Sequence, residues 1–191
     1  MHSPEPSRVV RWKAVEGDGL EHLLLRVDDA GVRAEGMLIG QRFGQRFGEP
    51  YAVRYHILCD AGWRVRRLSV ESLGGGGLVL LGDGQGRWTD GAGRPLDVLD
   101  GAIDVDLTAS CFTNTLPLRR LGSALAGRTL IEVAYVHIPE MACTRARQAY
   151  TRIAPGRVLY EGIGSDFQAE LDVDEDDLVL RYPGLFDRLG V

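Results

Sequence analysis

Two carboxylates and the hydrogen-bonding run that follows them are the part of this sequence best suited to chemistry. Asp104 and Asp106 alternate with apolar residues in a predicted strand, so both side chains lie on one face of it. The chain continues as Phe112-Thr-Asn-Thr-Leu-Pro-Leu-Arg-Arg-Leu121, which supplies hydroxyl, amide and guanidinium groups. Such a run can hold a polar ligand group, or it can satisfy buried backbone groups of the protein itself.

The sequence leaves two interpretations of the paired carboxylates open. Two carboxylates a few ångströms apart can act as acid and base, or can bind a cation. Alternatively, Asp104 and Asp106 pair with Arg119, Arg120 or backbone N–H groups and only fix the turn that follows the strand.

Other motifs with catalytic or metal-binding chemistry fail on spacing. Asp172, Asp174 and Asp176 begin like a calcium loop, but Asp177 stands where such a loop needs Gly and Pro183 where it needs Glu. We therefore predict that residues 174–177 form a solvated hairpin tip. The four His residues show no metal spacing, and neither a nucleophile elbow nor a phosphate loop is present. We predict no catalytic residue, no metal and no cofactor.

Composition limits the class of protein. With 191 residues, 45% hydrophobic and 26% charged, the chain is predicted to be one globular domain over residues 1–191. The formal net charge of -5 argues against a general nucleic-acid binder, although Arg64, Arg66 and Arg67 can form a local basic patch. Three Cys residues without metal spacing, no secretory signal and no bilayer-length apolar run predict a reduced, cytoplasmic protein without a membrane segment.

The pattern of apolar residues and turns predicts an antiparallel all-β fold. Strand-like segments recur along the chain and are separated by Gly-containing turns, of which the 25 Gly residues supply many. A short helix is allowed within residues 116–125, and residues 139–150 fit either a helix or a strand. A sheet of this length must roll or close to protect its edges. The strand-like segments are residues 9–12, 21–27, 32–39, 51–59, 63–71, 78–81, 86–88, 130–138, 167–173 and 178–182.

Several motifs, in a fixed order, resemble the family of bacterial "putative glycolipid-binding" proteins. They are Asp60-Ala-Gly-Trp63 with the Arg residues after it, Leu99-Asp-Gly with Asp104-Val-Asp106, the run from Phe112 to Leu121, and Tyr182-Pro-Gly-Leu-Phe186. The resemblance covers nearly the whole chain, although Ser110-Cys111 stands where the family usually has Thr-Pro. It implies a many-stranded antiparallel sheet wound into a spiral β-roll or half-barrel, similar in outline to periplasmic lipoprotein carriers.

The resemblance implies a protein that binds a small amphiphile or glycolipid, with an apolar chain inside the roll. Polar groups at one end would orient the head group. The residues expected to do so are Asp104, Asp106, Asn114, Arg119 and Arg120, with Arg54, His56, Trp63 and Arg66 as secondary candidates.

Two further functions stay open. In one, the protein is a hydrolase or isomerase acting on a glycosylated or lipid-like metabolite, with Asp104 or Asp106 as the base. In the other, the polar motif is purely architectural and the protein acts through a partner. The ligand and the oligomeric state do not follow from the residues.

Overall fold

A computed structural model describes residues 7–41 and 49–190 of the chain. Within these residues, fourteen strands form one sheet, in the order β7-β6-β5-β4-β3-β2-β1-β14-β13-β12-β11-β10-β9-β8. The strands are β1 (Ser7–Ala14), β2 (Leu20–Asp28), β3 (Gly31–Gln41), β4 (Pro50–Cys59), β5 (Val65–Ser72), β6 (Gly77–Gly82), β7 (Trp88–Asp90), β8 (Asp104–Leu107), β9 (Thr129–His137), β10 (Ala142–Ala154), β11 (Arg157–Ile163), β12 (Gln168–Val173), β13 (Val179–Tyr182) and β14 (Phe186–Arg188).

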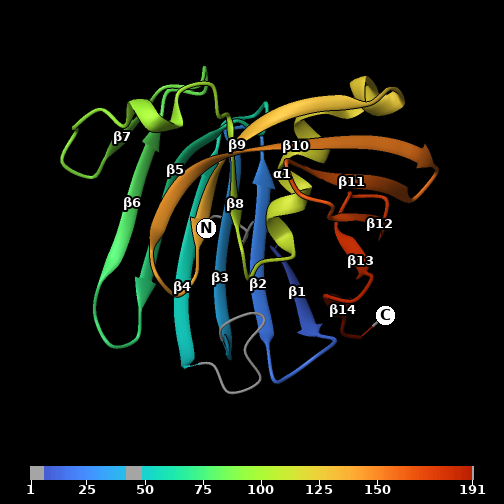
Figure 1. The fold of residues 1–191 in the computed structure, drawn as a ribbon, viewed down its shortest axis with the longest axis horizontal. Helices are drawn as coiled ribbons and strands as arrows, with labels where there is room; N and C mark the ends of the chain where they lie inside the picture. The colour runs from blue at the N-terminus through green and yellow to red at the C-terminus, as the bar shows by residue number, and fades with distance from the viewer. Residues whose placement is uncertain (1–6, 42–48, 191) are drawn as a thin grey trace, which may run out of the picture.

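The sheet rolls up without closing into a barrel, which confirms the all-β rolled prediction (Figure 1). Strands β1 to β6 form one layer, here named the outer layer, and β9 and β10 cross in front of it. Among the strands that the structure describes, every pairing is antiparallel except that of β8 with β9, where Asp104 lies beside Val133 and Leu107 beside Val136. No helix among the described residues is long and apolar enough to cross a membrane.

Alternation of side chains builds the core, as the sequence predicts. In β4, Val53, Tyr55, Ile57 and Cys59 are buried, whereas Arg54 and Leu58 between them are exposed. The predicted hairpin of residues 51–59 and 63–71 is the antiparallel pair β4 and β5. Because strand side chains alternate, one face of this layer lines the interior of the roll and the other faces outward.

The interior of the roll holds β8 and a short helix, α1 (Thr115–Leu121) (Figure 1). Leu116 and Leu118 of the helix belong to the same buried apolar cluster as Tyr55 of the outer layer. Pro117 lies in the first helical turn, where its missing N–H has no partner to lose, and the helix ends at Gly122, whose φ is 51°. The short helix predicted within residues 116–125 is confirmed.

Residues 139–150 form a turn and a strand, so the helical alternative for them is wrong. Strand β10 pairs with β9 on one edge and with β11 on the other, from Ala142 to Ala154. Met141 adopts φ 56° in the turn before it. Residues 142–150 pair with β9, and β11 adds a second partner from Arg147 onward. This backbone pairing outweighs a weak local helix propensity.

Candidate functional site

Asp104 and Arg120 form a nearly buried ion pair in the interior of the roll. The carboxylate is fully buried, and the guanidinium side chain is 13% exposed. Nε of Arg120 donates to Oδ1 of Asp104 at 3.0 Å, and Nη2 donates to Oδ2 at 2.5 Å. Burial raises the pKa of Asp104, and the hydrogen bonds and charge of Arg120 oppose that rise. This pair therefore joins the last turn of α1 to β8.

Asp106 points to the same face as Asp104 but has different partners. Its carboxylate accepts a hydrogen bond from Oγ1 of Thr113 at 2.9 Å and another from Nε2 of Gln148 at 2.6 Å. The Tyr150 hydroxyl lies within hydrogen-bond distance of two acceptors, 3.1 Å from Oδ1 of Asn114 and 3.3 Å from Oε1 of Gln148. The network connects β8, the turn before α1, and β10 through buried polar groups that satisfy one another.

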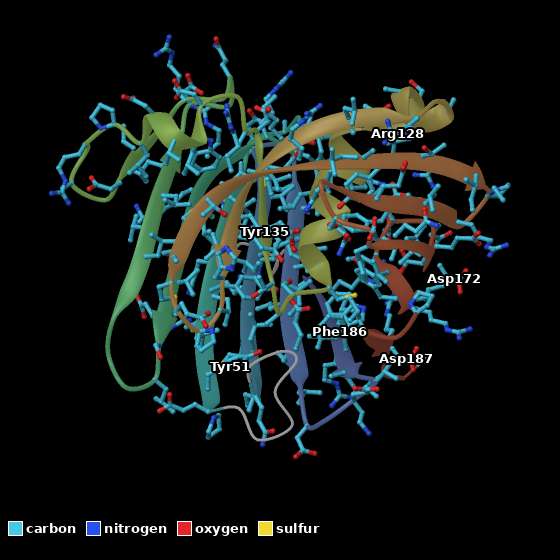
Figure 2. All side chains as sticks on the ribbon, in the orientation of Figure 1. Tyr51, Arg128, Tyr135, Asp172, Phe186 and Asp187 are labelled. Atoms are coloured by element: carbon cyan, nitrogen blue, oxygen red, sulfur yellow. The ribbon has the colours of Figure 1, made fainter. Side chains whose placement is uncertain are left out.

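The Asp106 carboxylate lies in an environment rich in tyrosine. Burial raises its pKa, while hydrogen bonds from Gln148 and Thr113 act in the opposite direction. The negative charge of Asp106 in turn helps to raise the pKa of Tyr135, which Figure 2 labels within the roll. A carboxyl group whose pKa is raised in this way holds its proton at a higher pH than a solvated one.

We expect Asp106 to make the stability of the protein depend on pH. Its folded pKa lies above the ordinary 3.8. The protonated Asp106 carboxyl group therefore contributes fully to the free energy of unfolding below pH 3.8. This contribution is lost as the pH rises through the folded pKa. The variant Asp106→Asn has no such proton to lose. Its oxygen can still accept from Gln148, and its amide group can donate to Oγ1 of Thr113. Urea unfolding from about pH 4 to pH 8 should give a shallower pH dependence for Asp106→Asn than for wild type.

Glu71 on β5 supplies the matched control, because it is an exposed carboxylate on the same sheet. Glu71→Gln should follow the wild-type profile. Equal pH slopes for Asp106→Asn and wild type would contradict the expectation.

Arg119 points away from Arg120 and contacts the outer layer. Its guanidinium lies 5.3 Å from the ring centre of Trp63, a cation–π distance. The two side chains line a cavity of about 200 Å³ together with Leu25 and Val27 of β2 and with Arg8. The structure thus brings two of the predicted site residues together, but separately from Asp104 and Asp106.

The acidic turn at residues 174–177 is a hairpin tip between β12 and β13, as predicted, but Asp174 and Asp177 form ion pairs there and are not solvated. Asp174 contacts Arg8 at 2.7 Å and Arg188 at 2.6 Å. Asp177 contacts Arg152 at 2.6 Å. The two Asp side chains are 14% and 13% exposed. Roll-up of the sheet brings arginines of distant strands onto this turn, which its local sequence does not reveal.

Three of the secondary candidates lie on the outward side of the roll. Arg54 is exposed and lies 3.4 Å from Glu35. His56 follows it on the same side of β4, because Tyr55 between them points inward. Arg66 is exposed and donates through Nε to the carbonyl of Gly82. None of these three side chains joins the network around Asp106.

Glu21 is a buried polar residue that the motif analysis misses. Its carboxylate accepts hydrogen bonds from the Tyr55 hydroxyl, the Ser110 hydroxyl and the Cys111 N–H, each at 2.6 Å. The Phe112 N–H donates to it at 3.4 Å. Burial raises the pKa of Glu21, and the hydrogen bonds from these four donors act in the opposite direction. The carboxylate attaches the turn before α1 to β2 and satisfies N–H groups that begin the helical segment.

Paired glycines and tyrosines are the sequence signal that points to Glu21. Gly36 and Gly40 on β3 lie in register with Tyr55 and Tyr51 on β4. A Cβ atom at Gly36 would lie 2.1 Å from the Tyr55 ring, and one at Gly40 would lie 3.1 Å from the Tyr51 hydroxyl. Glycine therefore lets each ring lie across β3, and Tyr55 reaches Glu21 on β2.

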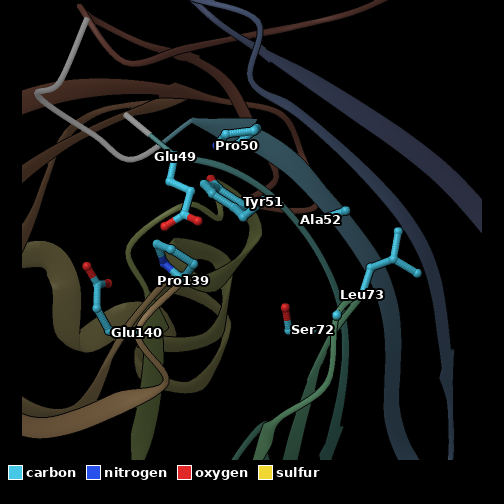
Figure 3. Close-up of a pocket in the computed structure, with 9 residues that line it drawn as sticks. Glu49, Pro50, Tyr51, Ala52, Ser72, Leu73, Pro139 and Glu140 are labelled. Atoms are coloured by element: carbon cyan, nitrogen blue, oxygen red, sulfur yellow. The ribbon is translucent and has the colours of Figure 1, made fainter. Parts of the chain in front are cut away.

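The end cavity, as we name it, has a volume of about 790 Å³ and is lined by the start of β4, the end of β5 and the turn after β9. In Figure 3, Glu49 and Tyr51 face Pro139 and Glu140 across this space, and Ser72 lies on a further side. Burial and the negative charge of Glu21 raise the pKa of Tyr51 to about 12. The phenol therefore stays protonated at neutral pH and can donate a hydrogen bond.

Comparison with known proteins gives two matches. A family model described as "Putative glycolipid-binding" matches residues 9–188. The crystal structure of a DUF1089 family protein from Pseudomonas aeruginosa is similar, with 42% sequence identity and a TM-score of 0.78 over 93% of this chain and 95% of that chain. No curated protein matches the chain. The family match spans the sheet from β1 to β14.

Proposed function

The chain belongs to the family described as "Putative glycolipid-binding", and on that premise we propose that it is a non-enzymatic protein that binds a glycolipid-like amphiphile. The end cavity is the observation that carries this proposal. Its volume of about 790 Å³ lies in the range of ligand sites in proteins. It is open to solvent, so a head group can enter it while the rest of the ligand extends away.

The chemistry of the end cavity suits a sugar. The Tyr51 ring and the ring of Pro139 offer flat, largely apolar surfaces on which the C–H face of a sugar can pack. Carboxylates of Glu49 and Glu140 can accept hydrogen bonds from sugar hydroxyls, and the hydroxyl of Ser72 can donate or accept. Few polar groups in a defined cavity are typical of sites that orient a ligand.

Within this proposal, the polar motif around β8 supports the walls of the roll. Asp104, Asp106 and Asn114 direct their side chains to protein partners, as does Glu21. A satisfied buried network gives rigidity to the elements that it joins. A rigid wall lowers the entropic cost of ordering a ligand.

The first test is native mass spectrometry of the gently purified protein, followed by organic extraction. We expect a bound mass that extraction releases as a glycolipid or a similar amphiphile. A second test titrates the protein with decyl maltoside and with maltose. Tighter binding of decyl maltoside would show that the chain contributes. Failure of the protein to bind any amphiphile at about millimolar concentration, where free energies of only about 4 kcal/mol suffice, would overturn the proposal.

Narrowing the end cavity should weaken binding without harming the fold. Ser72 is a partly exposed residue that lines the cavity, so Ser72→Phe places an aromatic ring in the space that the head group needs. Calorimetric titration with decyl maltoside should show at least a tenfold loss of affinity, or about 1.4 kcal/mol.

Ser69 on the same strand is the matched control, since it is also partly exposed and lies outside the cavity lining. Ser69→Phe should bind decyl maltoside as wild type does. Equal binding by Ser72→Phe and Ser69→Phe would place the ligand elsewhere on the molecule.

The raised pKa of Asp106 favours one second candidate, a hydrolase or isomerase with this carboxylate as base. Asp104 is less suited to the role, because Arg120 already compensates its charge. On this alternative, Asp106→Asn folds normally yet loses turnover of a glycosylated or lipid-like metabolite. Retained turnover in that variant would exclude Asp106 as the base.

A further inference from the structure

A further cavity, here named the side cavity, lies at the other end of β9 from the end cavity. It has a volume of about 360 Å³, and its lining includes Ile103, Arg120, Leu121, Leu130 and Arg147. Leu130 lies near the start of β9, whereas Pro139 of the end cavity follows that strand. At about 3.3 Å per residue, the strand path from Leu130 to Pro139 is roughly 30 Å long. A ligand of one cavity does not fill the other.

We propose that the side cavity binds a monoanionic amphiphile, in which a carboxylate or phosphodiester group contacts Arg120 and Arg147 while an apolar chain covers Leu121 and Leu130. This inference is independent of the sugar site in the end cavity. It rests on the charge, exposure and apolar character of the lining.

The first residue that can bind an anion is Arg120, whose guanidinium is oriented by its ion pair with Asp104. Asp104 contacts its Nε and Nη2 edge, so Nη1 lies outside that pair. Only 13% of the side chain is exposed, and it lines the cavity. A guanidinium that is already oriented loses little entropy when it binds an anion.

Arg147 supplies the net positive charge. Among residues 7–41 and 49–190, its side chain takes part in no ion pair or hydrogen bond. Glu132, which also lines the cavity and lies across from Arg147 in the register of β9 and β10, is 3.4 Å from Arg145. Arg120 is balanced by Asp104, and Arg145 by Glu132. One positive charge, that of Arg147, remains, and this matches a single negative charge on the ligand.

An apolar surface adjoins these cations. Leu130 is 49% exposed although it is a large aliphatic residue, and Ile103 and Leu121 beside it are partly exposed. Covering this surface with an alkyl chain would remove apolar area from water. Because the whole protein carries a formal net charge of -5, general electrostatics disfavour anions, and any binding of an anion must come from a local site.

Titration with sodium decanoate, below its micelle concentration, tests the proposal, with amide shifts in ¹⁵N NMR as the readout. We expect decanoate to bind and to shift the amides of Gly101, Leu130 and Ile131. Acetate, inorganic phosphate and decyl maltoside should not produce these shifts, since each lacks either the chain or the charge. Decanoate that leaves these amides unmoved, or acetate that moves them equally, would overturn the proposal.

Variants test the charge assignment. Arg147→Gln should weaken decanoate binding at least tenfold, and Glu132→Gln should strengthen it by removing the carboxylate opposite Arg147. Arg67→Gln is the matched control, because Arg67 is an exposed arginine on β5 outside the cavity lining. Equal weakening by Arg147→Gln and Arg67→Gln would show a general charge effect and contradict the site. Decyl maltoside binding should be unchanged in all three variants, which separates this site from the end cavity.

Discussion

Glu21→Ala should destabilise the protein by about 4 kcal/mol, the largest effect that we expect of a single substitution. The change removes the acceptor of four donors, two hydroxyls and two backbone N–H groups, all in the interior. Orphaned buried donors cost about 1–3 kcal/mol each, although the hydroxyls of Tyr55 and Ser110 can turn to other partners. Urea unfolding followed by circular dichroism gives the measurement.

A partly exposed glutamate, Glu35, separates this effect from the loss of a charge. Glu35 on β3 lies at the surface, 3.4 Å from Arg26 and 3.4 Å from Arg54. Since exposed ion pairs contribute little, Glu35→Ala should change stability by less than about 1 kcal/mol. Our account of Glu21 would be refuted by equal losses in the two variants.

Gly36→Ala is expected to cost about 3 kcal/mol through one added methyl group. The new Cβ atom would lie 2.1–2.4 Å from two ring carbons and the hydroxyl oxygen of Tyr55. The ring must therefore move, and its hydroxyl then loses the 2.6 Å hydrogen bond to Glu21. Thermal unfolding and urea unfolding should both report the loss.

A double-mutant cycle identifies the clash as the cause. Tyr55→Ala removes the ring, so Gly36→Ala should cost far less in that background than in wild type. Gly127 gives the matched control, because its φ is -120° and a Cβ there would meet nothing within 4 Å. Gly127→Ala should be neutral or slightly stabilising. Additive losses at residues 36 and 55 would contradict the steric explanation.

Glu21 and Gly36 both help to attach the turn before α1 to the outer layer. Glu21 receives hydrogen bonds from Tyr55 on β4 and from Cys111 beside that turn. The turn leads into the helix that carries Arg119 and Arg120. A loss at Glu21 or Gly36 should therefore also disturb the side cavity, which Arg120 lines.

The sequence alone determined the all-β class, most strands and the family. Alternation of apolar residues and the Gly-containing turns carry the strand pattern, because side-chain direction in a strand has a strict period of two. The order of specific motifs, above all Phe112 to Leu121, carried the family resemblance, which the match over residues 9–188 confirms. Alternation also placed Asp104 and Asp106 on one face.

Only the tertiary structure decided what the polar residues contact. Ion pairs such as Arg8 with Asp174, 166 residues apart, arise when the sheet rolls up, and no local pattern encodes them. For the same reason Arg119 and Arg120, neighbours in sequence, have different partners, Trp63 and Asp104. Residues 142–150 form a strand because β9 pairs with all of them and β11 pairs with the last four. The cavities likewise exist only between elements that the roll brings together, since a pocket is a property of surfaces that meet in space.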